Sequence, residues 1–213
     1  MKKRAGAGYF ITLEGGDGSG KSTQSRLLAE FLKDAGIEPL LTREPGGAPG
    51  AEDIRALLVT GEVDRWDAIG ETLLFNAARR NHLRLTIWPA LDAGKWVISD
   101  RFADSTMAYQ GYGNGLGTEA VERIHHFTMG NFVPDLTFIL DLPAEEGLKR
   151  ARGRGDNEDR FEKMDLAFHE RLRSGFLEIA RANPARCVLI DALQGVDAVQ
   201  SEMRKVVTSR LLP

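Results

Sequence analysis

Cysteine is almost absent from this chain of 213 residues. Cys187 stands alone in the apolar run Cys187–Ile190, so an intramolecular disulfide is excluded and no cysteine pair has the spacing of a zinc site. We interpret Cys187 as a small hydrophobic residue buried in a strand. This cysteine usage fits a reducing compartment.

Long hydrophobic runs and an excess of one charge are also missing. No window approaches the roughly 18 apolar residues of a membrane span, and the apolar stretch after the basic start Met1–Arg4 is too short for a signal peptide. The net charge of -3 and the pI near 5.9 give no general attraction to nucleic acids or anionic membranes. We therefore expect a cytoplasmic protein without a nucleic-acid or membrane partner.

What the chain does contain is an alternation of short apolar runs with segments of helical periodicity. The runs are nearly continuous, which is typical of strands buried on both faces of a parallel sheet. We expect one domain over 1–213, a three-layer, doubly wound α/β fold. The predicted strands are Tyr9–Glu14, Glu38–Thr42, Trp96–Ser99, Leu136–Asp141 and Cys187–Asp191. The predicted helices are Lys21–Ala35, Ala51–Val59, Asp67–Ala93, Thr118–Met129, Ala144–Arg152, Arg160–Asn183 and Val196–Arg210.

Two segments interrupt this alternation. Arg43–Gly50 is rich in proline and glycine and follows the second predicted strand, at the edge of the sheet where open α/β folds bind ligands. Arg152–Arg160 is glycine-rich and highly charged, and it lies between two predicted helices. We interpret it as part of a mobile lid at about 150–160. A solvated run of balanced charges is the alternative.

A phosphate-binding motif follows the first predicted strand. The sequence matches G-x-x-x-x-G-K-[ST], and a helix is predicted after it, as the motif requires. Glycines let backbone N–H groups converge on phosphate at a helix N-terminus. Lys21 is predicted to bridge the β- and γ-phosphates of ATP, and the Ser22 hydroxyl to coordinate Mg²⁺. The alternative is a glycine-rich turn that matches by accident. The predicted ATP-binding residues are Gly15, Gly16, Asp17, Gly18, Ser19, Gly20, Lys21, Ser22 and Thr23.

Candidate acceptor residues occur at a strand end and on a helix. Asp100 and Arg101 follow the buried run of the third strand, where Asp100 could hold Mg²⁺ through water and Arg101 could bind a second phosphate. A surface ion pair is the alternative. Phe75 and Arg79 lie one helical turn apart and share a face, which suits stacking on a base and hydrogen bonding to it. Taken singly, a phenylalanine such as Phe75 is more often a core residue, and an arginine such as Arg79 is more often solvated.

These residues together resemble the bacterial thymidylate kinases, and the similarity runs along nearly the whole chain. The T-R-E-P-G-G and D-R-F-x-x-S-x-x-A-Y-Q patterns are distinctive of that family among P-loop kinases. The matching stretches are Gly15–Ser22, Thr42–Gly47, Leu74–Arg79, Asp100–Gln110 and Asp159–Glu162.

The resemblance implies roles for individual residues. Asp17 would lie near the 3′-hydroxyl and phosphate of thymidine monophosphate (dTMP), and Arg101 would hold that phosphate. Phe75 would stack on thymine, and Arg79 would donate to its O4. Tyr109 would crowd the 2′ position and disfavour ribose. The other implied dTMP-binding residues are Arg43, Glu44, Ser105, Thr106 and Gln110. The resemblance also implies a homodimer, a five-stranded sheet of order 2-3-1-4-5, and adenine binding near Asp191 and Ala192.

The family places its catalytic arginine in the P-loop or in the lid. The variable P-loop positions of this chain carry no basic residue, whereas the lid offers four arginines, so the resemblance implies the class with lid arginines. A mobile cation that arrives after ATP suits the charge of a transferring phosphoryl group. The choice between Arg152 and Arg154 stays open. The lid arginines are Arg150, Arg152, Arg154 and Arg160.

No general base is required, because a phosphate oxygen is already nucleophilic at neutral pH. Accordingly, we interpret all four histidines as structural or exposed. The rival functions are another monophosphate or small-molecule kinase of this fold, and a P-loop switch or partition protein. The N-K-x-D motif of GTPases and the early P-loop lysine of partition ATPases are both absent. We expect ATP-dependent phosphorylation of dTMP with Mg²⁺.

Overall fold

The apolar runs of the sequence form a parallel sheet. A computed structural model describes residues 8–151 and 160–212, and in this part of the chain five strands lie in the order β2-β3-β1-β4-β5. The expected fold class and strand order are both confirmed. The strands are β1 (Phe10–Glu14), β2 (Leu40–Arg43), β3 (Val97–Asp100), β4 (Leu136–Asp141) and β5 (Cys187–Asp191).

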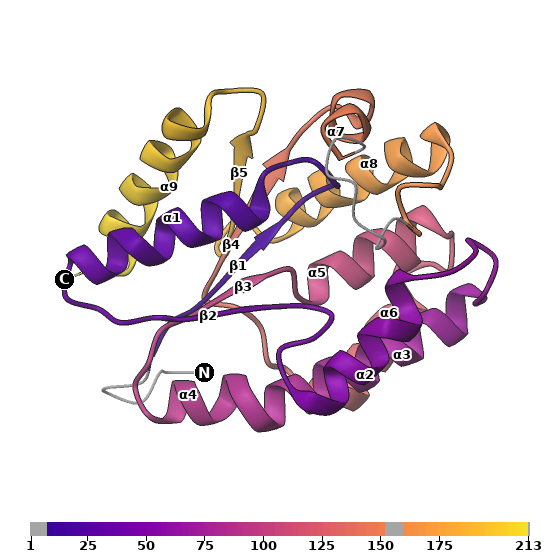
Figure 1. The fold of residues 1–213 in the computed structure, drawn as a ribbon, viewed down its shortest axis with the longest axis horizontal. Coiled ribbons are helices and arrows are strands. Elements are labelled where there is room, and N and C mark those ends of the chain that lie inside the picture. Colours follow the sequence, from indigo (N-terminus) through magenta and orange to yellow (C-terminus); the bar gives the residue numbers. More distant parts are fainter. Residues whose placement is uncertain (1–7, 152–159, 213) are drawn as a thin grey trace.

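Helical segments connect the strands and cover both faces of the sheet (Figure 1). None in the described ranges is long and apolar enough to cross a membrane. The α-helices are α1 (Lys21–Asp34), α2 (Pro49–Val59), α3 (Ala68–His82), α4 (Trp88–Asp92), α5 (Ala103–Thr106), α6 (Thr118–Met129), α7 (Ala144–Ala151), α8 (Leu166–Ala182) and α9 (Val196–Arg210). The π-helical segments are η1 (Leu83–Ile87) and η2 (Met107–Gly113).

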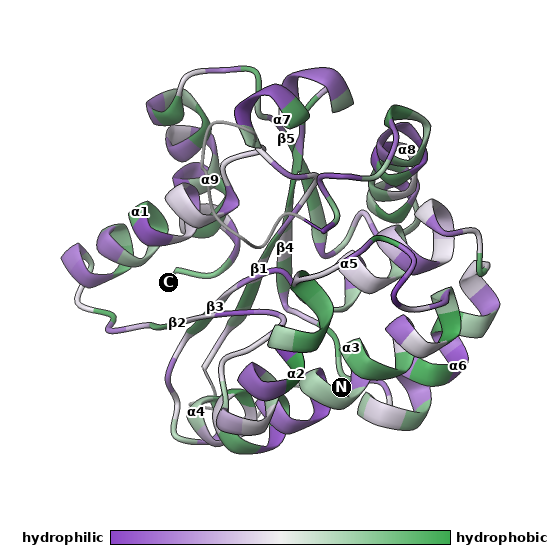
Figure 2. Cartoon of the chain, turned by 45° about the vertical axis from the view of Figure 1, so that its right-hand side comes forward, coloured by the Kyte–Doolittle hydropathy of each residue, from purple (hydrophilic) through white to green (hydrophobic). Residues whose placement is uncertain are grey.

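The core lies on the two faces of the three inner strands. Helices α1 and α9 pack on one face through residues such as Leu28 and Met203, while η1, α4, α5, η2 and α8 lie toward the other. Figure 2 shows the apolar strands at the centre and the hydrophilic sides of the helices turned outward. Burial on both faces holds for β1 and β4 but is wrong for the edge strands, since β2 and β5 alternate with exposed positions. An edge strand has a neighbour on one side only.

Two predicted helices differ from the structure. The segment predicted as one helix over 67–93 is divided by η1, where the N–H of Trp88 bonds to the carbonyl of Leu83. Pro89 follows directly, and proline has no N–H for the regular ladder, so a wider turn is accommodated there. The helix predicted to start at Arg160 starts at Leu166 instead. The Asp165 carboxylate accepts from the N–H of Phe168 and caps that start.

A helix that we did not predict follows β3. Segments α5 and η2 form a continuous helical stretch over 103–113, and their start is fixed next to the ends of β1 and β3. Asp100 pairs in register with Leu13 of β1 and with Arg43 of β2. The carboxyl ends of these strands therefore bring the P-loop, Arg43 and the 103–113 helix to one edge of the sheet.

Candidate active site

The P-loop joins β1 to α1 at this edge. Gly20 precedes α1 with a φ of 90°, a conformation that glycine adopts without strain. The first turn of α1 has no side-chain cap and no acidic residue. Its free N–H groups and the positive end of the helix dipole therefore form a site for an anion.

The P-loop backbone packs directly on α7. A Cβ atom on Gly18 would lie 2.1 Å from the carbonyl oxygen of Gly147, and a Cβ atom on Gly147 would lie 2.6 Å from the carbonyl oxygen of Asp17. Both distances are impossible for real atoms. The two glycines thus determine how closely the loop and the helix approach each other.

Lys21 folds back over its own loop. The ammonium Nζ donates to the carbonyl oxygens of Gly16 (2.7 Å) and Gly15 (3.1 Å). Burial lowers the pKa of Lys21 to about 8, helped by the neighbouring Arg101 and opposed by Asp17. The cation is therefore already in the loop that would receive phosphate.

Two oxygen ligands meet beside the start of α1. The Ser22 hydroxyl donates to Oδ2 of Asp100 at 2.5 Å, and both residues line the main cavity. A hydroxyl and a carboxylate are the hard oxygen donors that Mg²⁺ prefers. The pair fits the Mg²⁺ site that the sequence predicts.

Arg101 reaches across the P-loop from the end of β3. Its φ of 70° is rare for a residue with a side chain. The guanidinium donates to Asp17 (2.6 Å) and to the Tyr109 hydroxyl (2.9 Å), and on its other side to the Gly15 carbonyl (3.0 Å) and Ser105 Oγ (3.1 Å). Burial alone would raise the pKa of Asp17, but Arg101 and Lys21 outweigh it, and the pKa is lowered.

Glu14, the last residue of β1, supports Arg101 indirectly through Ser105. Its carboxyl accepts from the N–H of Phe102 (2.8 Å) and from the Ser105 hydroxyl (2.5 Å). Burial, with the nearby Asp104, raises the pKa of Glu14 to about 8. The Ser105 hydroxyl thus links Glu14 to Arg101.

Arg79 is buried, with only 1% of its surface exposed. Nε donates to Glu44 (2.7 Å), and Nη2 donates to Thr106 Oγ1 (2.9 Å) and to the Phe102 carbonyl (3.1 Å). The other oxygen of Glu44 contacts Nδ1 of His82 at 3.0 Å. Nη1 of Arg79 has no hydrogen-bond partner among residues 8–151 and 160–212. A guanidinium held at three points therefore keeps one donor unused at the cavity that it lines.

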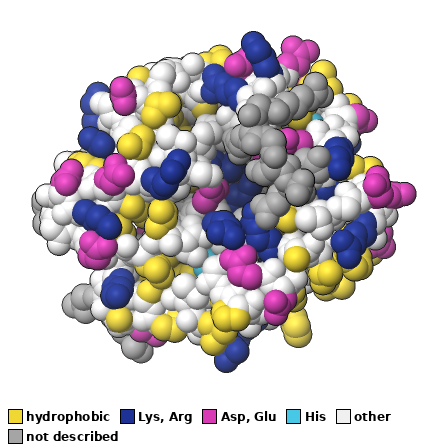
Figure 3. Space-filling view, viewed as in Figure 1, with side chains coloured by type: hydrophobic (Ala, Val, Ile, Leu, Met, Phe, Trp, Pro, Cys, Tyr) yellow, Lys and Arg dark blue, Asp and Glu magenta, His cyan; other side chains and the backbone are white. Residues whose placement is uncertain are grey.

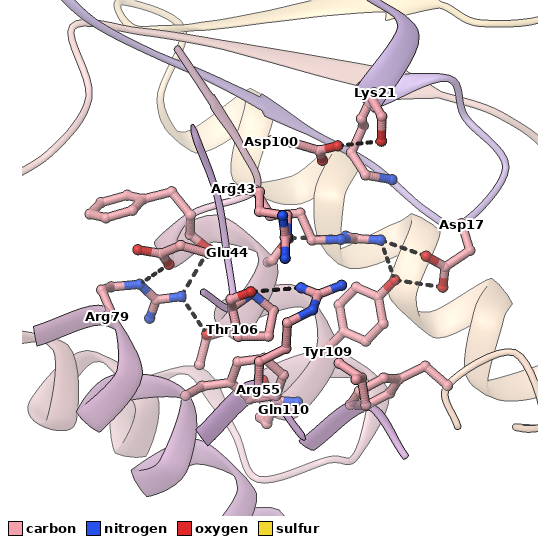
Figure 4. A pocket seen from close by; sticks show the side chains of 18 of the residues that line it. Asp17, Lys21, Arg43, Glu44, Arg55, Arg79, Asp100, Thr106, Tyr109 and Gln110 are labelled. Carbon is pink, nitrogen blue, oxygen red and sulfur yellow. Dashed lines mark hydrogen bonds and ion pairs between the residues drawn. The ribbon is translucent and has the colours of Figure 1, made fainter. Parts of the chain in front are cut away.

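Gln110 is the complementary case. Its Nε2 donates to Glu71 at 2.6 Å, and its Oε1 is buried without a partner. The residue is fully buried and lines the same cavity as Arg79. Two residues that line the cavity thus carry an unused donor and an unused acceptor within the described part of the chain (Figure 4).

These residues surround a cavity of about 540 Å³. Lys and Arg side chains gather in the hollow that Figure 3 shows at the middle of the face. Four aromatic residues line it: Phe75, Phe102, Tyr109 and Phe161. Phe75 and Phe161 have ring centroids 6.1 Å apart, and Tyr109 and Phe161 have centroids 5.3 Å apart. The predicted site residues that line the cavity are Asp17, Gly20, Lys21, Ser22, Thr23, Arg43, Glu44, Phe75, Arg79, Asp100, Arg101, Ser105, Thr106, Tyr109 and Gln110.

Four predicted P-loop residues are not in the lining of this cavity: Gly15, Gly16, Gly18 and Ser19. Gly15 and Gly16 line a small cavity behind the P-loop. Arg43 lines the main cavity while forming an exposed ion pair with Glu52. Arg152 and Arg154 lie outside the described residues. Arg160, one of the four lid arginines, is 2% exposed and ion-paired with Glu71, so it is anchored in the protein.

Six cavity residues were not predicted as site residues. Phe102, Phe161 and Glu162 stood in stretches that resemble the family, and for Phe161 an aromatic residue after a charged segment was the available signal. Arg55 sits on α2 and donates to the Pro45 carbonyl at 2.6 Å, and nothing in its sequence context marked it. The unpredicted lining residues are Pro45, Arg55, Val59, Phe102, Phe161 and Glu162.

Comparison with known proteins agrees with this geometry. The thymidylate kinase family profile matches residues 13–203. The chain is 55% identical over 204 residues to a thymidylate kinase of Caulobacter vibrioides, covering 96% of this chain and 98% of that protein. It is 58% identical over 184 residues to one of Dinoroseobacter shibae, covering 86% and 88%.

A solved structure shows the same fold. The crystal structure of thymidylate kinase from Ehrlichia chaffeensis superposes with a TM-score of 0.76 at 39% identity, covering 94% of this chain and 99% of that one. A profile match over most of the chain, together with relatives above 50% identity, excludes a chance match to the P-loop motif. The chain belongs to the thymidylate kinase family.

Proposed function

We propose that this protein transfers the γ-phosphoryl group of ATP to dTMP, forming dTDP and ADP for nucleotide synthesis. The observation that carries the proposal is the unused donor of Arg79 and the unused acceptor of Gln110 in one cavity with a P-loop. Thymine presents a carbonyl oxygen, O4, beside an N3–H. A donor and an acceptor on residues of one cavity suit its edge, and unpaired buried polar atoms gain most from such a ligand.

The base and the phosphates occupy opposite ends of the cavity. Phe75 would stack on thymine, and the ring of Tyr109 would crowd the 2′ position. Arg101 would hold the dTMP phosphate, and Asp17 would lie near the 3′-hydroxyl. Support comes from the hydrogen bonds of Arg101 to Asp17 and Tyr109, which tie these three groups together. The other dTMP-binding residues of the proposal are Arg43, Glu44, Ser105, Thr106 and Gln110.

Transfer needs positioning more than acid–base chemistry. An oxygen of the dTMP phosphate attacks the γ-phosphorus, the bond from that phosphorus to the bridging oxygen of ADP breaks, and ADP leaves with the electron pair. Lys21, Arg101 and the N-terminus of α1 would hold the two anions in line. The P-loop residues Gly15–Thr23 would bind the phosphates of ATP.

Mg²⁺ is expected to accompany ATP. Ser22 and Asp100 would hold it, directly or through water, and their oxygens already point at each other. When bound, the ion would screen the charge of the phosphates.

Several sequence-based predictions remain proposals. Arg152 and Arg154 would supply the catalytic cation, as in the lid-arginine class, from a lid over about 150–160 of a single domain, 1–213. Arg150 supports the placement of the lid next to the predicted adenine site, because Nη1 donates to the Ala192 carbonyl at 3.1 Å. A cytoplasmic location also stays a prediction.

We also propose a homodimer. Helices α3 and α6 contact each other, and together they expose Ile69, Leu73 and Phe127, the last with 91% of its surface accessible. An exposed apolar patch of this kind is characteristic of an interaction surface. A second copy using the same helices would give the two-fold interface that is commonest among soluble proteins.

A panel of acceptors tests the function. Thymidine, uridine, cytidine, adenosine and guanosine monophosphates are each supplied with ATP and Mg²⁺, and diphosphate formation is followed by coupled ADP release. We expect dTMP to be the best acceptor, with a finite preference over dUMP, because a methyl group contributes only about 1–3 kcal/mol. Lys21→Met should abolish turnover without unfolding the protein. Turnover of another monophosphate in preference to dTMP would replace the proposed function.

A further inference from the structure

A buried polar cluster lies behind the Gln110 wall of the cavity. Its centre is Glu71, on α3, with 1% of its surface exposed. Oε1 of Glu71 accepts from Nε2 of Gln110 (2.6 Å) and from Nδ2 of Asn114 (3.1 Å). Oε2 accepts from Nη1 of Arg160. One carboxylate thus joins the base-side wall to the residue that ends the predicted lid.

Arg160 has no freedom to turn away from Glu71. Nε donates to the carbonyl of Glu62 (3.0 Å), Nη1 to that of Leu58 (3.2 Å) and Nη2 to that of Val63 (2.9 Å). These carbonyls belong to the end of α2 and the turn after it. The guanidinium is therefore fixed among acceptors, and its only carboxylate partner in the described residues is Glu71.

The chemistry of this cluster determines which way the Gln110 amide faces. A carboxylate paired with a guanidinium can accept hydrogen bonds but cannot donate them. The NH₂ group of Gln110 must therefore face Glu71, and the carbonyl Oε1 is left on the other side without a partner. Turning the amide over would place a carbonyl dipole against the carboxylate and leave the NH₂ unpaired.

We propose that Glu71, held by Arg160, is a positioning residue that makes the base site select thymine and uracil rings over cytosine. The selection rests on the proposed dTMP kinase activity. Oε1 of Gln110 accepts from a ring N3–H, whereas cytosine presents an N3 lone pair and a 4-amino group. That amino group would also face Nη1 of Arg79, which can only donate. A cytosine ring therefore meets two unpaired contacts, and sites of this kind reject the wrong ligand strongly.

The Glu71→Gln variant tests the proposal because Arg160 dictates how the new amide must lie. The carbonyl introduced at position 71 has to face Arg160, so its NH₂ faces Gln110. The Gln110 amide then turns over and presents NH₂ to the cavity. We expect the ratio of kcat/KM for dTMP to that for 5-methyl-dCMP to fall by about tenfold or more, mainly through the nucleotide KM. The KM for ATP should not change.

Two further variants separate orientation from structural damage. Asn114→Ala removes another donor to the same oxygen of Glu71, so it perturbs the cluster while the discrimination ratio stays at the wild-type value. Glu71→Gln combined with Arg160→Met removes both buried charges together, which proteins tolerate better than the loss of one partner. In that double variant the Gln110 amide has no dictated orientation, and the ratio should also fall.

A measurement on the unmodified protein is independent of how the variants fold. The Nε2 protons of Gln110 should show a nuclear Overhauser contact to the Nδ2 protons of Asn114, because both groups donate to one oxygen of Glu71. Contacts to thymine instead, or a folded Glu71→Gln variant with an unchanged ratio, would overturn the proposal. If the wild-type protein does not phosphorylate dTMP, the proposed function fails, whereas the contact between Gln110 and Asn114 still reports the orientation.

Discussion

Individual arginines around the cavity are held by carboxylates rather than by solvent. Each one that could contact the proposed dTMP, or orient a group that does, is fixed before the nucleotide arrives. A preorganised cation loses little rotamer entropy on binding, which favours catalysis by positioning. The pairs are Arg79 with Glu44, Arg101 with Asp17, and Arg160 with Glu71.

Arg79→Lys tests the base-binding role at the residue scale. Lysine keeps a cation beside Glu44, but it lacks the fork that bonds Thr106 and leaves Nη1 free. We expect the KM for dTMP to rise by about tenfold or more, with the KM for ATP unchanged. Arg80→Lys, an exposed neighbour that donates to the Thr128 carbonyl, is the matched control. Equal shifts in both KM values would place Arg79 outside the base site.

Lys21 gives a pH-dependent signature. Its pKa is lowered to about 8, so the free protein loses this proton as the pH rises through 8, whereas ATP binds the charged form. ATP affinity should therefore decline above pH 8, by at most about tenfold per pH unit, and binding there should take up a proton. Calorimetry at pH 8.5 in two buffers of different ionisation enthalpy measures the uptake. Its absence would show that Lys21 does not meet the phosphates.

At the scale of elements, the contact between the P-loop and α7 is the tightest that we find around the site. A backbone approach of this kind cannot be seen from helix propensity, because Gly147 is a poor helix residue that the packing requires. The same is true of η1, where a proline and the core around Leu83 and Ile87 together decide the wider turn. Local sequence preference indicates that a helix forms, and tertiary packing determines its exact geometry.

Gly147→Ala separates these two influences. Alanine should favour helix α7 by about 1 kcal/mol, yet its Cβ would meet the Asp17 carbonyl 2.6 Å away. We expect the P-loop to shift and the KM for ATP to rise by about tenfold or more, since small displacements are costly in phosphoryl transfer. Glu145→Ala, at an exposed position of the same helix, should leave that KM unaltered. An unchanged KM in Gly147→Ala would mean that the loop adapts freely.

At the scale of the whole molecule, apolar side chains are exposed on α3 and α6, at Ile69, Leu73 and Phe127. The cavity residues Arg79 and Gln110 come from α3 and from η2, which both contact α6. A dimer through α3 and α6 would therefore brace the helices that carry the base site.

Phe127→Glu tests the dimer at this scale. A carboxylate at the most exposed apolar position should convert the proposed dimer to a monomer, since burying an unpaired charge is strongly unfavourable. Sedimentation velocity at micromolar concentration measures the change. Leu41→Glu, at an exposed position of β2, should sediment like the wild type. A wild-type monomer, or a dimer insensitive to Phe127, would show that another surface associates or none does.

Much of the fold was predictable because its signals are local. The bounds of β4, β5, α6 and α9 agree with the sequence-based ranges, since apolar runs and helical periodicity are properties of a few adjacent residues. The P-loop and the Asp100–Arg101 pair were identifiable for the same reason. Segment 103–113 was missed as a helix, because its conformation depends on Glu14 accepting from Phe102 and Ser105.

By itself, the sequence determined the layered sheet, the P-loop motif and most of the residues that line the cavity. Only the tertiary structure decided which of those residues are free to bind and which are already engaged. Arg79 and Arg160 are both buried arginines beside a carboxylate. Arg79 keeps one nitrogen without a partner in the described residues, whereas each nitrogen of the Arg160 guanidinium donates to an acceptor. Their partners come from segments tens of residues away, so only folding brings together the acceptors that decide between binding and anchoring.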